Sequence, residues 1–344
     1  MKTLLTNLSP AEMAEALQVK PFQARQLFRW LHQKQIFDIE KMTDLSKELR
    51  ARLTETCEPA QLSLAHTSES PRSTTKKLLF RLQDGETVES VLIRERERVT
   101  VCVSTQVGCA VKCSFCATGL SGYKRNLSAG EIAEQALHLL SGENIEGRHP
   151  NIVYMGMGEP FRNYDAVISS VRLLMDKEGM GVGARRITIS TAGEAEGIRR
   201  FAGEPWQVRL SISLHAANDD LRDELVPLNK RYPLKTLREA VGYYAEVTGR
   251  HVTFEWVLLD GVNDGMKDVG EIAGFVEGLD ATVNLIPFNP VQGTPYAPPP
   301  RGKSESFRNA LVARGIKTTL RKEKGQDINA ACGQLRRQAL SLGA

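Results

Sequence analysis

The chain has 344 residues, of which 41% are hydrophobic and 25% are charged. This balance is typical of a folded globular protein with one large core, and it excludes an intrinsically disordered chain. No apolar run is long enough to cross a bilayer, and residues 1–10 lack the basic start, apolar stretch and small-residue cleavage site of a secretory signal. We therefore expect a cytoplasmic protein that does not enter a membrane.

Cysteine content and charge narrow the class further. Six cysteines are too few for a disulfide scaffold in a chain of this length, and in a reducing compartment a local group of cysteines indicates metal or redox chemistry. The net charge of +4 does not by itself indicate a nucleic-acid binder. Basic residues accumulate near the C-terminus and could follow a phosphate backbone, although a solvated surface is the commoner meaning of such a run. They are Arg314, Lys317, Arg321, Lys322, Lys324, Arg336 and Arg337.

Residues 1–60 are expected to form a small helical accessory domain that binds RNA. Ser9, Pro10 and Glu12 make a capping box with proline at the first helical position, and Pro21 and residues 43–46 look like further helix starts. Aromatic and basic side chains are mixed in this region and could stack on RNA and neutralise it. A buried aromatic core with arginines facing water explains the same mixture. The residues are Phe22, Arg25, Phe28, Arg29, Trp30 and His32.

Residues 61–98 are expected to form a linker followed by a β-extension. The stretch 63–75 is polar and unpatterned, which predicts a linker. Two apolar runs, 78–82 and 87–93, flank Asp84 and Gly85 and predict a β-hairpin.

Residues 99–322 show a different pattern, in which short apolar runs alternate with helical stretches. A capping box at Ser128 and Glu131 opens one helix over 128–141, and others begin near Asn163, Pro233 and Met266. Such alternation is typical of an α/β fold with a parallel sheet, here a partial (β/α) barrel whose strand-end loops carry the chemistry. A C-terminal segment, 323–344, follows the barrel. The predicted strands are 99–104, 151–156, 186–190, 208–214, 251–259, 282–287 and 316–321.

The loop after the first of these strands carries Cys109, Cys113 and Cys116 within eight residues. A structural zinc site normally needs four protein ligands, and the next histidine along the chain, His138, lies inside a predicted helix. Three thiolates suffice for a cubane cluster whose fourth iron binds a cofactor. A zinc knuckle with a distant fourth ligand and ordinary core cysteines remain as alternatives.

This spacing, with Phe115 before the last cysteine, resembles the radical S-adenosylmethionine (SAM) superfamily. The resemblance implies a (β/α)6 partial barrel, one [4Fe-4S] cluster on Cys109, Cys113 and Cys116, and SAM on the open iron. The glycine-rich loop 156–160 stands where family members bind the SAM amino group. Each matching residue could alone be an ordinary turn or strand end, and a lone histidine is more often structural. The SAM positions implied are Gly158, Glu159, Ser190, Ser213, Leu214, His215 and Asn289.

Within the superfamily, essentially the whole chain is similar to the bacterial enzymes that methylate C2 of an adenine in 23S ribosomal RNA, at the peptidyl transferase centre, and in transfer RNA, next to the anticodon. The segment 326–335, which contains Cys332, is the most specific match. The other matching segments are 88–91, 102–109, 124–127, 154–160, 213–218, 226–230 and 284–289.

The resemblance implies a mechanism that uses two SAM molecules per turnover. Cys332 accepts a methyl group from the first, and a radical derived from the second activates the S-methyl carbon for addition to C2, which is too electron-poor to attack SAM directly. Cys102 then releases the product by forming a transient disulfide with Cys332. Glu89 is the implied proton acceptor, although a glutamate at this strand position commonly faces solvent. Cys57 matches no functional position and is interpreted as structural.

Three alternatives stay open. The related C8 methyltransferase, which confers antibiotic resistance on the ribosome, shares every residue named for the C2 enzymes, and no single residue separates the two reactions. A radical SAM enzyme acting on a peptide or metabolite would not need both Cys102 and Cys332. A non-catalytic iron–sulfur, zinc or RNA-binding protein is the third. From the resemblance we expect a flavodoxin-type reducing partner and a monomer, with Arg25, Arg29, Arg321 and Lys322 as the hypothesised RNA contacts.

Overall fold

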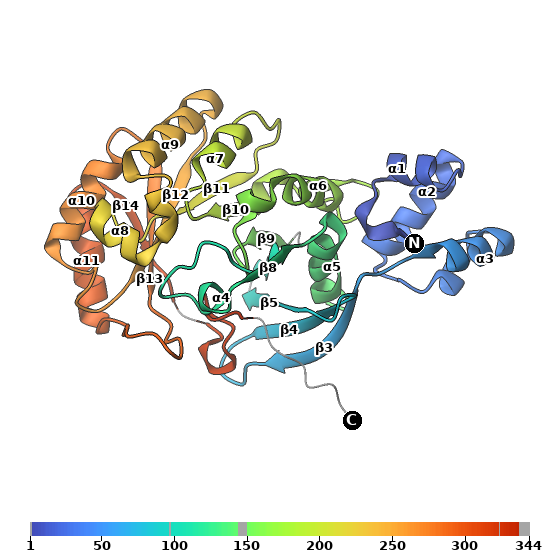
Figure 1. The fold of residues 1–344 in the computed structure, drawn as a ribbon, viewed down its shortest axis with the longest axis horizontal. Helices are drawn as coiled ribbons and strands as arrows, with labels where there is room; N and C mark the ends of the chain where they lie inside the picture. The colour runs from blue at the N-terminus through green and yellow to red at the C-terminus, as the bar shows by residue number, and fades with distance from the viewer. Residues whose placement is uncertain (1, 96–97, 144–149, 323, 337–344) are drawn as a thin grey trace.

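A single curved sheet organises the larger part of the molecule (Figure 1). The computed structural model describes residues 2–95, 98–143, 150–322 and 324–336. The ten strands follow the spatial order β14-β13-β12-β11-β10-β9-β6-β5-β4-β3. They are β3 (Leu62–Glu69), β4 (Thr75–Leu82), β5 (Thr87–Glu95), β6 (Arg98–Cys102), β9 (Asn151–Tyr154), β10 (Ile187–Thr191), β11 (Arg209–Ser213), β12 (Val252–Leu258), β13 (Ala281–Pro287) and β14 (Lys317–Leu320).

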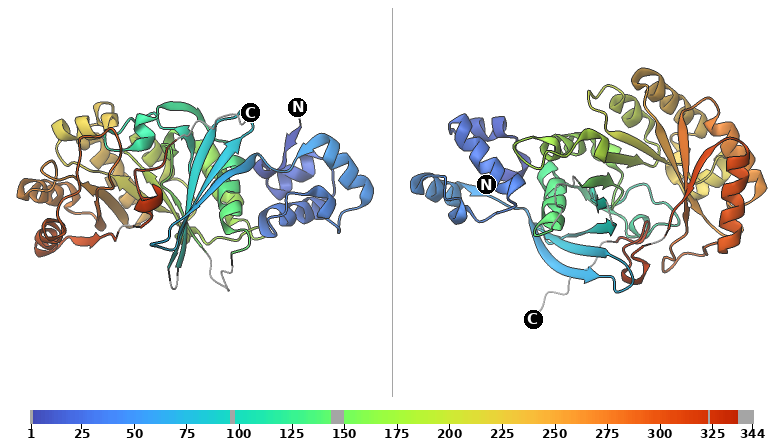
Figure 2. Two further views of the ribbon diagram at one scale, coloured as in Figure 1. Left: turned by 90° about the horizontal axis from the view of Figure 1, so that it is seen from below. Right: turned by 180° about the vertical axis from the view of Figure 1, so that it is seen from behind.

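The part of the sheet from β6 to β14 is parallel. β6, β9, β10, β11, β12 and β13 are each followed by at least one helix before the next parallel strand, so these strands form six βα units and β14 closes the series. This confirms the predicted partial barrel. The helices lie on the outer face of the curve (Figures 1 and 2) and are α5 (Ala129–Leu140), α6 (Tyr164–Met175), α7 (Ala195–Phe201), α8 (Asp219–Leu225), α9 (Leu234–Thr248), α10 (Met266–Val276) and α11 (Arg301–Ala313).

Local sequence signals explain where these helices begin and which face they bury. The capping box predicted for α5 is present, since Ser128 Oγ accepts from Glu131 N at 3.1 Å and Glu131 Oε2 accepts from Ser128 N at 2.8 Å. Helices cover the outer face of the parallel strands, which must therefore be apolar, and Ile187 and Ile189, which share one face of β10, are fully buried together with apolar neighbours on adjoining strands. The core therefore lies between the strands and the outer helices.

The stretch 63–75 is not the linker that its polarity predicted. Most of it is strand β3, which pairs with β4, and β4 and β5 continue into β6 as an antiparallel extension of the barrel sheet. Leu62 is buried, but the next five residues are exposed. An edge strand whose side chains mostly meet water has a polar sequence without the alternation that identifies a half-buried strand, which explains the error.

Residues 2–58 form a separate lobe at one end of the molecule (Figures 1 and 2). Phe28, Trp30 and His32 are buried, as the alternative of an aromatic core predicted, whereas Phe22 is 49% exposed. The predicted capping box at Ser9 is present. The elements of this lobe are β1 (Thr3–Leu4), η1 (Leu5–Asn7), α1 (Pro10–Ala16), α2 (Pro21–Phe28), η2 (Arg29–Gln33), η3 (Ile39–Lys41), α3 (Lys47–Thr56) and β2 (Cys57–Glu58).

A network of hydrogen bonds joins this lobe to the barrel. The carboxylate of Glu134, on α5, accepts from Thr6 Oγ1 and from the backbone N–H groups of Gln61 and Leu62 at 2.9 Å each. Asn7 Oδ1 accepts from Gly130 N at 2.6 Å. The first barrel helix is thereby fixed to the N-terminal lobe at its own N-terminal turns.

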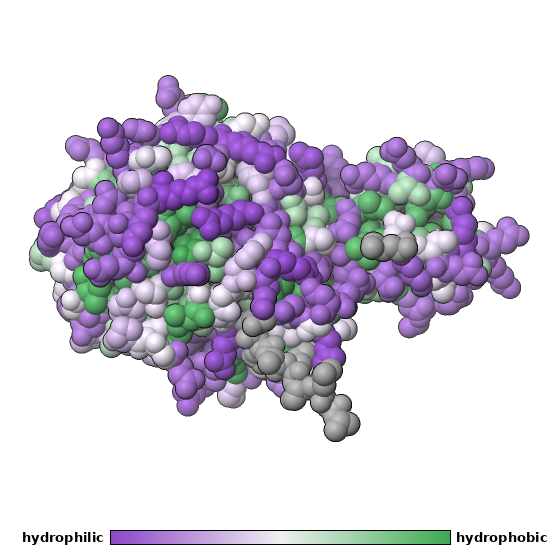
Figure 3. Space-filling model, in the orientation of Figure 1, coloured by the Kyte–Doolittle hydropathy of each residue, from purple (hydrophilic) through white to green (hydrophobic). Residues whose placement is uncertain are grey.

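The surface agrees with a protein that folds in water. In the orientation of Figure 1 it is mainly hydrophilic, with apolar residues showing in a depression over the barrel (Figure 3). None of the helices in the described ranges is long and apolar enough to span a bilayer.

Candidate active site at the strand ends

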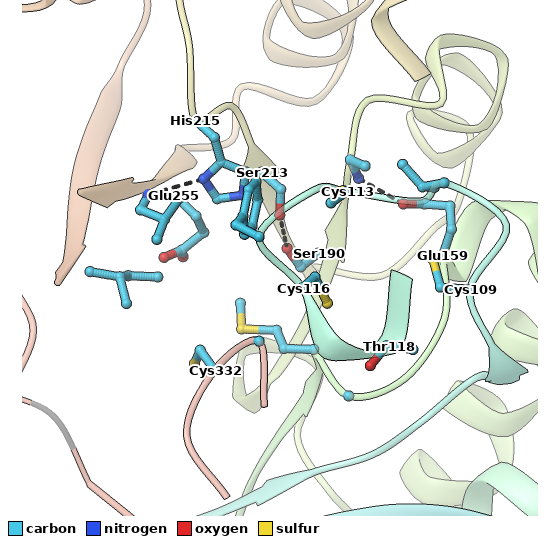
Figure 4. Close-up of a pocket in the computed structure, with 18 of the residues that line it drawn as sticks. Cys109, Cys113, Cys116, Thr118, Glu159, Ser190, Ser213, His215, Glu255 and Cys332 are labelled. Atoms are coloured by element: carbon cyan, nitrogen blue, oxygen red, sulfur yellow. Dashed lines mark hydrogen bonds between the residues drawn. The ribbon is translucent and has the colours of Figure 1, made fainter. Parts of the chain in front are cut away.

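The loops after the carboxyl ends of the parallel strands surround a cavity that opens to solvent and holds about 970 Å³ of empty space, its open mouth included. Concave sites at the strand ends of barrel folds commonly take up small-molecule cofactors. Figure 4 shows the three cysteines of the first loop on one side, Cys332 on the opposite side, and Ser190, Ser213 and His215 on the adjoining wall. The strand-end location is the one expected for the chemistry of a βα barrel.

A small hairpin and a short helix shape the cysteine loop. β7 (Gln106–Gly108) pairs with β8 (Tyr123–Asn126), and α4 (Ala117–Leu120) lies between them in the chain. Cys109 N donates to Gly122 O at 3.1 Å, and Cys116 N donates to Cys113 O at 3.2 Å. Gly119 is required here, because a Cβ at this position would lie 2.8 Å from Cys113 O.

Burial dominates the electrostatics of Cys109 and Cys113. It raises the pKa of Cys109 to about 12 and that of Cys113 well above its usual value, and the neighbouring sulfurs add to the increase. Each sulfur therefore lies within electrostatic reach of another. Buried thiols of this kind are neutral until a metal displaces their protons.

The glycine-rich loop after β9 packs too closely against the first strand-end loop for side chains at its glycines. A Cβ at Gly156 would lie 2.7 Å from Ser104 Oγ, and one at Gly158, where φ is +108°, would lie 2.6 Å from Thr105 Oγ1. Glu159 lines the cavity and is buried. Its carboxylate accepts from Ala192 N at 2.7 Å and from Phe161 N at 3.1 Å, while burial raises its pKa to about 7.

Ser190, Ser213 and His215 line the same cavity. Their positions follow from the strand register, since Ser190 and Ser213 end neighbouring strands and their hydroxyl oxygens lie 3.4 Å apart. His215 Nδ1 accepts from Val257 N at 3.0 Å, and burial lowers the pKa of its imidazole to about 3, so the ring is neutral with its proton on Nε2. Leu214 is fully buried and contributes backbone, its N–H donating to Glu255 O at 3.0 Å.

Asn289 lies outside the cavity lining and holds the C-terminal segment. Its Nδ2 donates to Cys332 O at 3.1 Å, and its Oδ1 accepts from Gln326 Nε2 at 2.7 Å. The backbone of Gly333 accepts from Ala117 N, at the start of α4, at 2.8 Å. These contacts fasten the segment that carries Cys332 to both the barrel and the cysteine loop.

Cys332 is exposed toward the cavity, and Cys102 is half-buried where β6 ends. Both are free thiols in the structure. Burial raises the pKa of Cys102 to about 12, and the negative charge of the Cys332 sulfur adds to that increase. Two cysteines separated by 230 positions are thus brought within electrostatic reach.

Glu89 does not face solvent, contrary to the common expectation for its strand position. It is fully buried, its Oε1 lies 2.8 Å from Lys77 Nζ, and its Oε2 accepts from Arg336 N at 2.9 Å. Lys77 also donates to Asn329 O at 3.2 Å. Lys77 and Glu89 thus join the antiparallel extension to the C-terminal segment. Lys77 contacts Asn329, before Cys332 in the chain, and Glu89 contacts Arg336, after it.

Two charged residues at the site, Arg222 and Glu255, escaped the sequence analysis, and a third, Arg321, was assigned there to the basic surface. Arg222 is fully buried and donates to backbone oxygens of the loops after β10 and β11. Glu255 and Arg321 line the cavity, so Arg321 is not a residue of the basic surface. A carboxylate within the apolar run 251–259 was a signal for Glu255, whereas Arg222 lies in an ordinary charged helix that gave none.

Comparisons with known proteins place the chain in a family. The model of the Radical SAM superfamily matches residues 103–275, and that of the ribosomal RNA large subunit methyltransferase N-terminal domain matches residues 4–58. The chain is 45% identical over 318 residues to a protein of Geobacillus kaustophilus and 43% identical over 318 residues to one of Bacillus subtilis; each alignment covers 92% of this chain and 87% of the relative. Both relatives are named probable dual-specificity RNA methyltransferase RlmN. The chain belongs to the RlmN family of radical SAM enzymes.

A solved structure supports the same assignment. The radical SAM methyltransferase from Sphaerobacter thermophilus superposes with a TM-score of 0.94 at 48% identity, and the match covers 97% of this chain and 99% of that one. The resemblance seen in the sequence motifs and the barrel architecture are thereby confirmed.

Membership of the RlmN family implies a [4Fe-4S] cluster and SAM, and the donor set fits both. Three thiols of one loop line one side of the cavity, which leaves the fourth corner of a cubane open toward the strand-end residues. Among the described residues, no three metal-ligating side chains are gathered as closely as a single metal ion requires, whereas a cubane binds each cysteine through a different iron atom.

Proposed function

We propose that this protein methylates C2 of a specific adenine in 23S ribosomal RNA, at the peptidyl transferase centre, and in transfer RNA, next to the anticodon. Two SAM molecules are consumed per turnover, and Cys332 carries the methyl group. The observation that supports this most strongly is the position of Cys332, which shares a cavity with Cys109, Cys113 and Cys116 and has Cys102 within electrostatic reach. A radical SAM enzyme for a peptide or metabolite has no use for this second pair of thiols.

The geometry of the cavity supports the proposed cofactor residues. Cys109, Cys113 and Cys116 hold the cluster, which when bound supplies the electron that converts SAM into an organic radical. Gly158, Glu159, Ser190, Ser213 and His215 line the wall against which SAM lies, and Leu214 and Asn289 support it.

The thiols divide the methyl transfer into two steps. Cys332 loses its proton to solvent, and its sulfur attacks the methyl carbon of SAM; a sulfur–carbon bond forms as the sulfonium–carbon bond breaks. For the transferred carbon to join adenine, a hydrogen atom would leave the S-methyl group for the radical that bound SAM supplies, the ring proton would go to Glu89, and one electron would return to the cluster. Cys102 then attacks the sulfur of Cys332. A disulfide forms, the sulfur–carbon bond breaks with its electron pair on the carbon, and that carbon takes up a proton. A thiol reductant then restores both cysteines.

Glu89 is the proposed acceptor of the adenine ring proton. Its carboxylate is held beside the Cys332 segment by Lys77 and by the backbone N–H of Arg336. A positioned carboxylate at hydrogen-bond reach from the reacting base can remove such a proton.

We further propose how the rest of the chain contributes. Residues 1–60 bind RNA, residues 61–98 connect this unit to the radical SAM core of 99–322, and residues 323–344 deliver Cys332. The exposed Arg25, Arg29 and Lys322 contact RNA, which must expose its adenine by flipping or local opening. The protein acts as a cytoplasmic monomer with a flavodoxin-type reducing partner.

Peptide and nucleoside mass spectrometry tests the proposal. Reduced holoenzyme incubated with methyl-labelled SAM should carry label on Cys332, and added RNA should acquire 2-methyladenosine. Cys332→Ala should abolish the RNA product while SAM cleavage continues. Undiminished product from Cys332→Ala would refute the role of this residue, and 8-methyladenosine would favour the C8 reaction, whose enzymes share the same site residues.

A further inference from the structure

Arg321 is a cationic group in contact with Cys332, the thiol proposed to carry the methyl group. It follows β14, and its backbone N–H donates to Leu285 O at 2.8 Å, which extends the pairing of β14 with β13 and directs the side chain into the cavity. Its Nη1 lies 3.6 Å from Cys332 Sγ, within the range of a hydrogen bond to sulfur. The guanidinium therefore touches an atom that reacts.

The charged groups around Arg321 come from four elements. Glu255 lies on β12, Cys102 on β6, Glu95 on β5 and Cys332 on the C-terminal segment, and all four raise the pKa of the guanidinium when they are ionised. Glu255 is held by Ser211 Oγ at 2.9 Å and Asn284 Nδ2 at 2.6 Å, and Glu95 is paired with Lys324 and Arg98. The two thiols are the groups near Arg321 whose charge changes during the proposed reaction.

Two charged neighbours, Cys332 and Arg321, shift the pKa of Cys102 in opposite directions. The negative charge of Cys332 opposes ionisation of the Cys102 thiol, whereas the positive charge of Arg321 favours it. Methylation turns the Cys332 sulfur into a neutral thioether. It thereby removes the charge that repels the Cys102 thiolate and leaves the guanidinium without its first partner.

We propose that Arg321 serves the two thiols in succession, pairing with the Cys332 thiolate while that sulfur accepts the methyl group and with the Cys102 thiolate once Cys332 is methylated. This order keeps Cys102 protonated until a methylated Cys332 exists for it to attack. The proposal rests on the proposed function for the identity of the two steps, but the pairing itself exists in the protein without SAM or RNA.

Alkylation of thiols by iodoacetamide measures the pairing directly, because only the thiolate reacts. The experiment uses anaerobic holoprotein without SAM, shown by its intact mass to be unmethylated, so that the cluster protects its three cysteines. Peptide mass spectrometry at pH 7.5 then gives separate rates for Cys332 and Cys102. Arg321→Gln should slow alkylation of Cys332 severalfold, because it removes the cation that lies 3.6 Å from the sulfur. Arg321→Lys should restore most of the rate.

Two controls separate local charge from general effects. Lys322→Gln removes the adjacent exposed charge and should leave both rates unchanged. Cys57 is buried, so it should stay unreactive in every folded variant and become reactive in one that misfolds.

The succession is tested with Cys332→Met, a neutral thioether of similar bulk to S-methylcysteine. Alkylation of Cys102 should be faster in Cys332→Met than in the wild type, and the increase should disappear when Arg321→Gln is added. If alkylation of Cys102 stays fast in the variant that combines Cys332→Met with Arg321→Gln, the increase comes from easier access of the reagent to Cys102. That result would overturn the proposal.

Unchanged Cys332 alkylation in a folded Arg321→Gln variant would overturn it equally. If Arg321→Gln misfolds, the wild type is compared with Cys332→Met alone. If Cys102 is then alkylated no faster in Cys332→Met than in the wild type, the proposed order of pairing is refuted. None of these rates depends on RNA methylation, so failure of the proposed function is recognised separately from failure of this proposal.

Discussion

Arg222 is a buried group whose removal should disturb the site strongly, although Arg222 itself is not a proposed cofactor ligand. Its guanidinium donates to Leu214 O at 3.0 Å, Ala192 O at 2.6 Å, Ser213 O at 3.3 Å and Asn229 Oδ1 at 2.9 Å. Arg222→Met leaves four buried acceptors without this donor, each at about 1–3 kcal/mol. Burial lowers the pKa of Arg222 to about 10 from 12.5, so the variant recovers about 3 kcal/mol of charge burial. We expect a net loss of about 4 kcal/mol.

Thermal unfolding of the holoprotein, followed by circular dichroism, measures this loss. A change of this size should lower Tm by about 5–6 °C in a chain of 344 residues. SAM binding, measured by calorimetry, should weaken as well, because the loops that carry Ser213 and Ala192 lose their common anchor. Arg222→Lys keeps the charge but cannot reach both loops, so its effect should be intermediate.

Arg231→Met is the matched control for Arg222→Met. Arg231 is exposed and lies 3.7 Å from Glu196, a surface pair worth about 0–1 kcal/mol. Its loss should leave Tm and SAM binding nearly unchanged. If Arg222→Met were no more harmful than Arg231→Met, the assignment of Arg222 as an anchor of the strand-end loops would be wrong.

Three further substitutions test other parts of the account. Gly158→Ala places a Cβ 2.6 Å from Thr105 Oγ1 at a positive φ, so it should cost about 2 kcal/mol or more of unfolding free energy, and a wild-type Tm would contradict this. Burial raises the pKa of Glu134 to about 7 from 4.5, so the folded state binds this proton more tightly than the unfolded chain; stability should fall as pH rises from about 4.5 to about 7. Glu134→Gln should remove about 3 kcal/mol of this pH dependence, and a Tm curve parallel to the wild type between pH 5 and 8 would refute it. Lys77→Met removes the ammonium that pairs with buried Glu89, so it should lower the free energy of unfolding by about 3–5 kcal/mol and speed proteolysis of the C-terminal segment. Equal cleavage rates in the variant and the wild type would show that the Lys77–Glu89 pair does not hold this segment.

The elements that could be predicted from the sequence are those with local signals. The helix α5 begins where the Ser128 and Glu131 capping box predicts, because a cap depends on residues three positions apart. The parallel strands coincide with short apolar runs, which are also a signal that can be read within a few residues. The motif of Cys109, Cys113 and Cys116 is local too, and the structure brings it to the strand ends together with Ser190 and its neighbours.

Features that depend on distant contacts could not be predicted in this way. β3 is a strand because β4 pairs with it, and its own polar sequence gives no such indication. The role of Arg321 depends on Cys332 folding back beside it, and Arg222 depends on two loops that converge on α8. Glu89 is buried only because Lys77 and the C-terminal segment cover it. In each case the tertiary environment determines what the residue does.

The central claim is that this enzyme places a methyl group on C2 of adenine in RNA. The most direct measurement is mass spectrometry of nucleosides from 23S ribosomal RNA and transfer RNA after incubation with reduced holoenzyme and methyl-labelled SAM. The account predicts labelled 2-methyladenosine in both RNAs. Labelled 8-methyladenosine, or no methylated adenosine from an enzyme that demonstrably cleaves SAM, would contradict it.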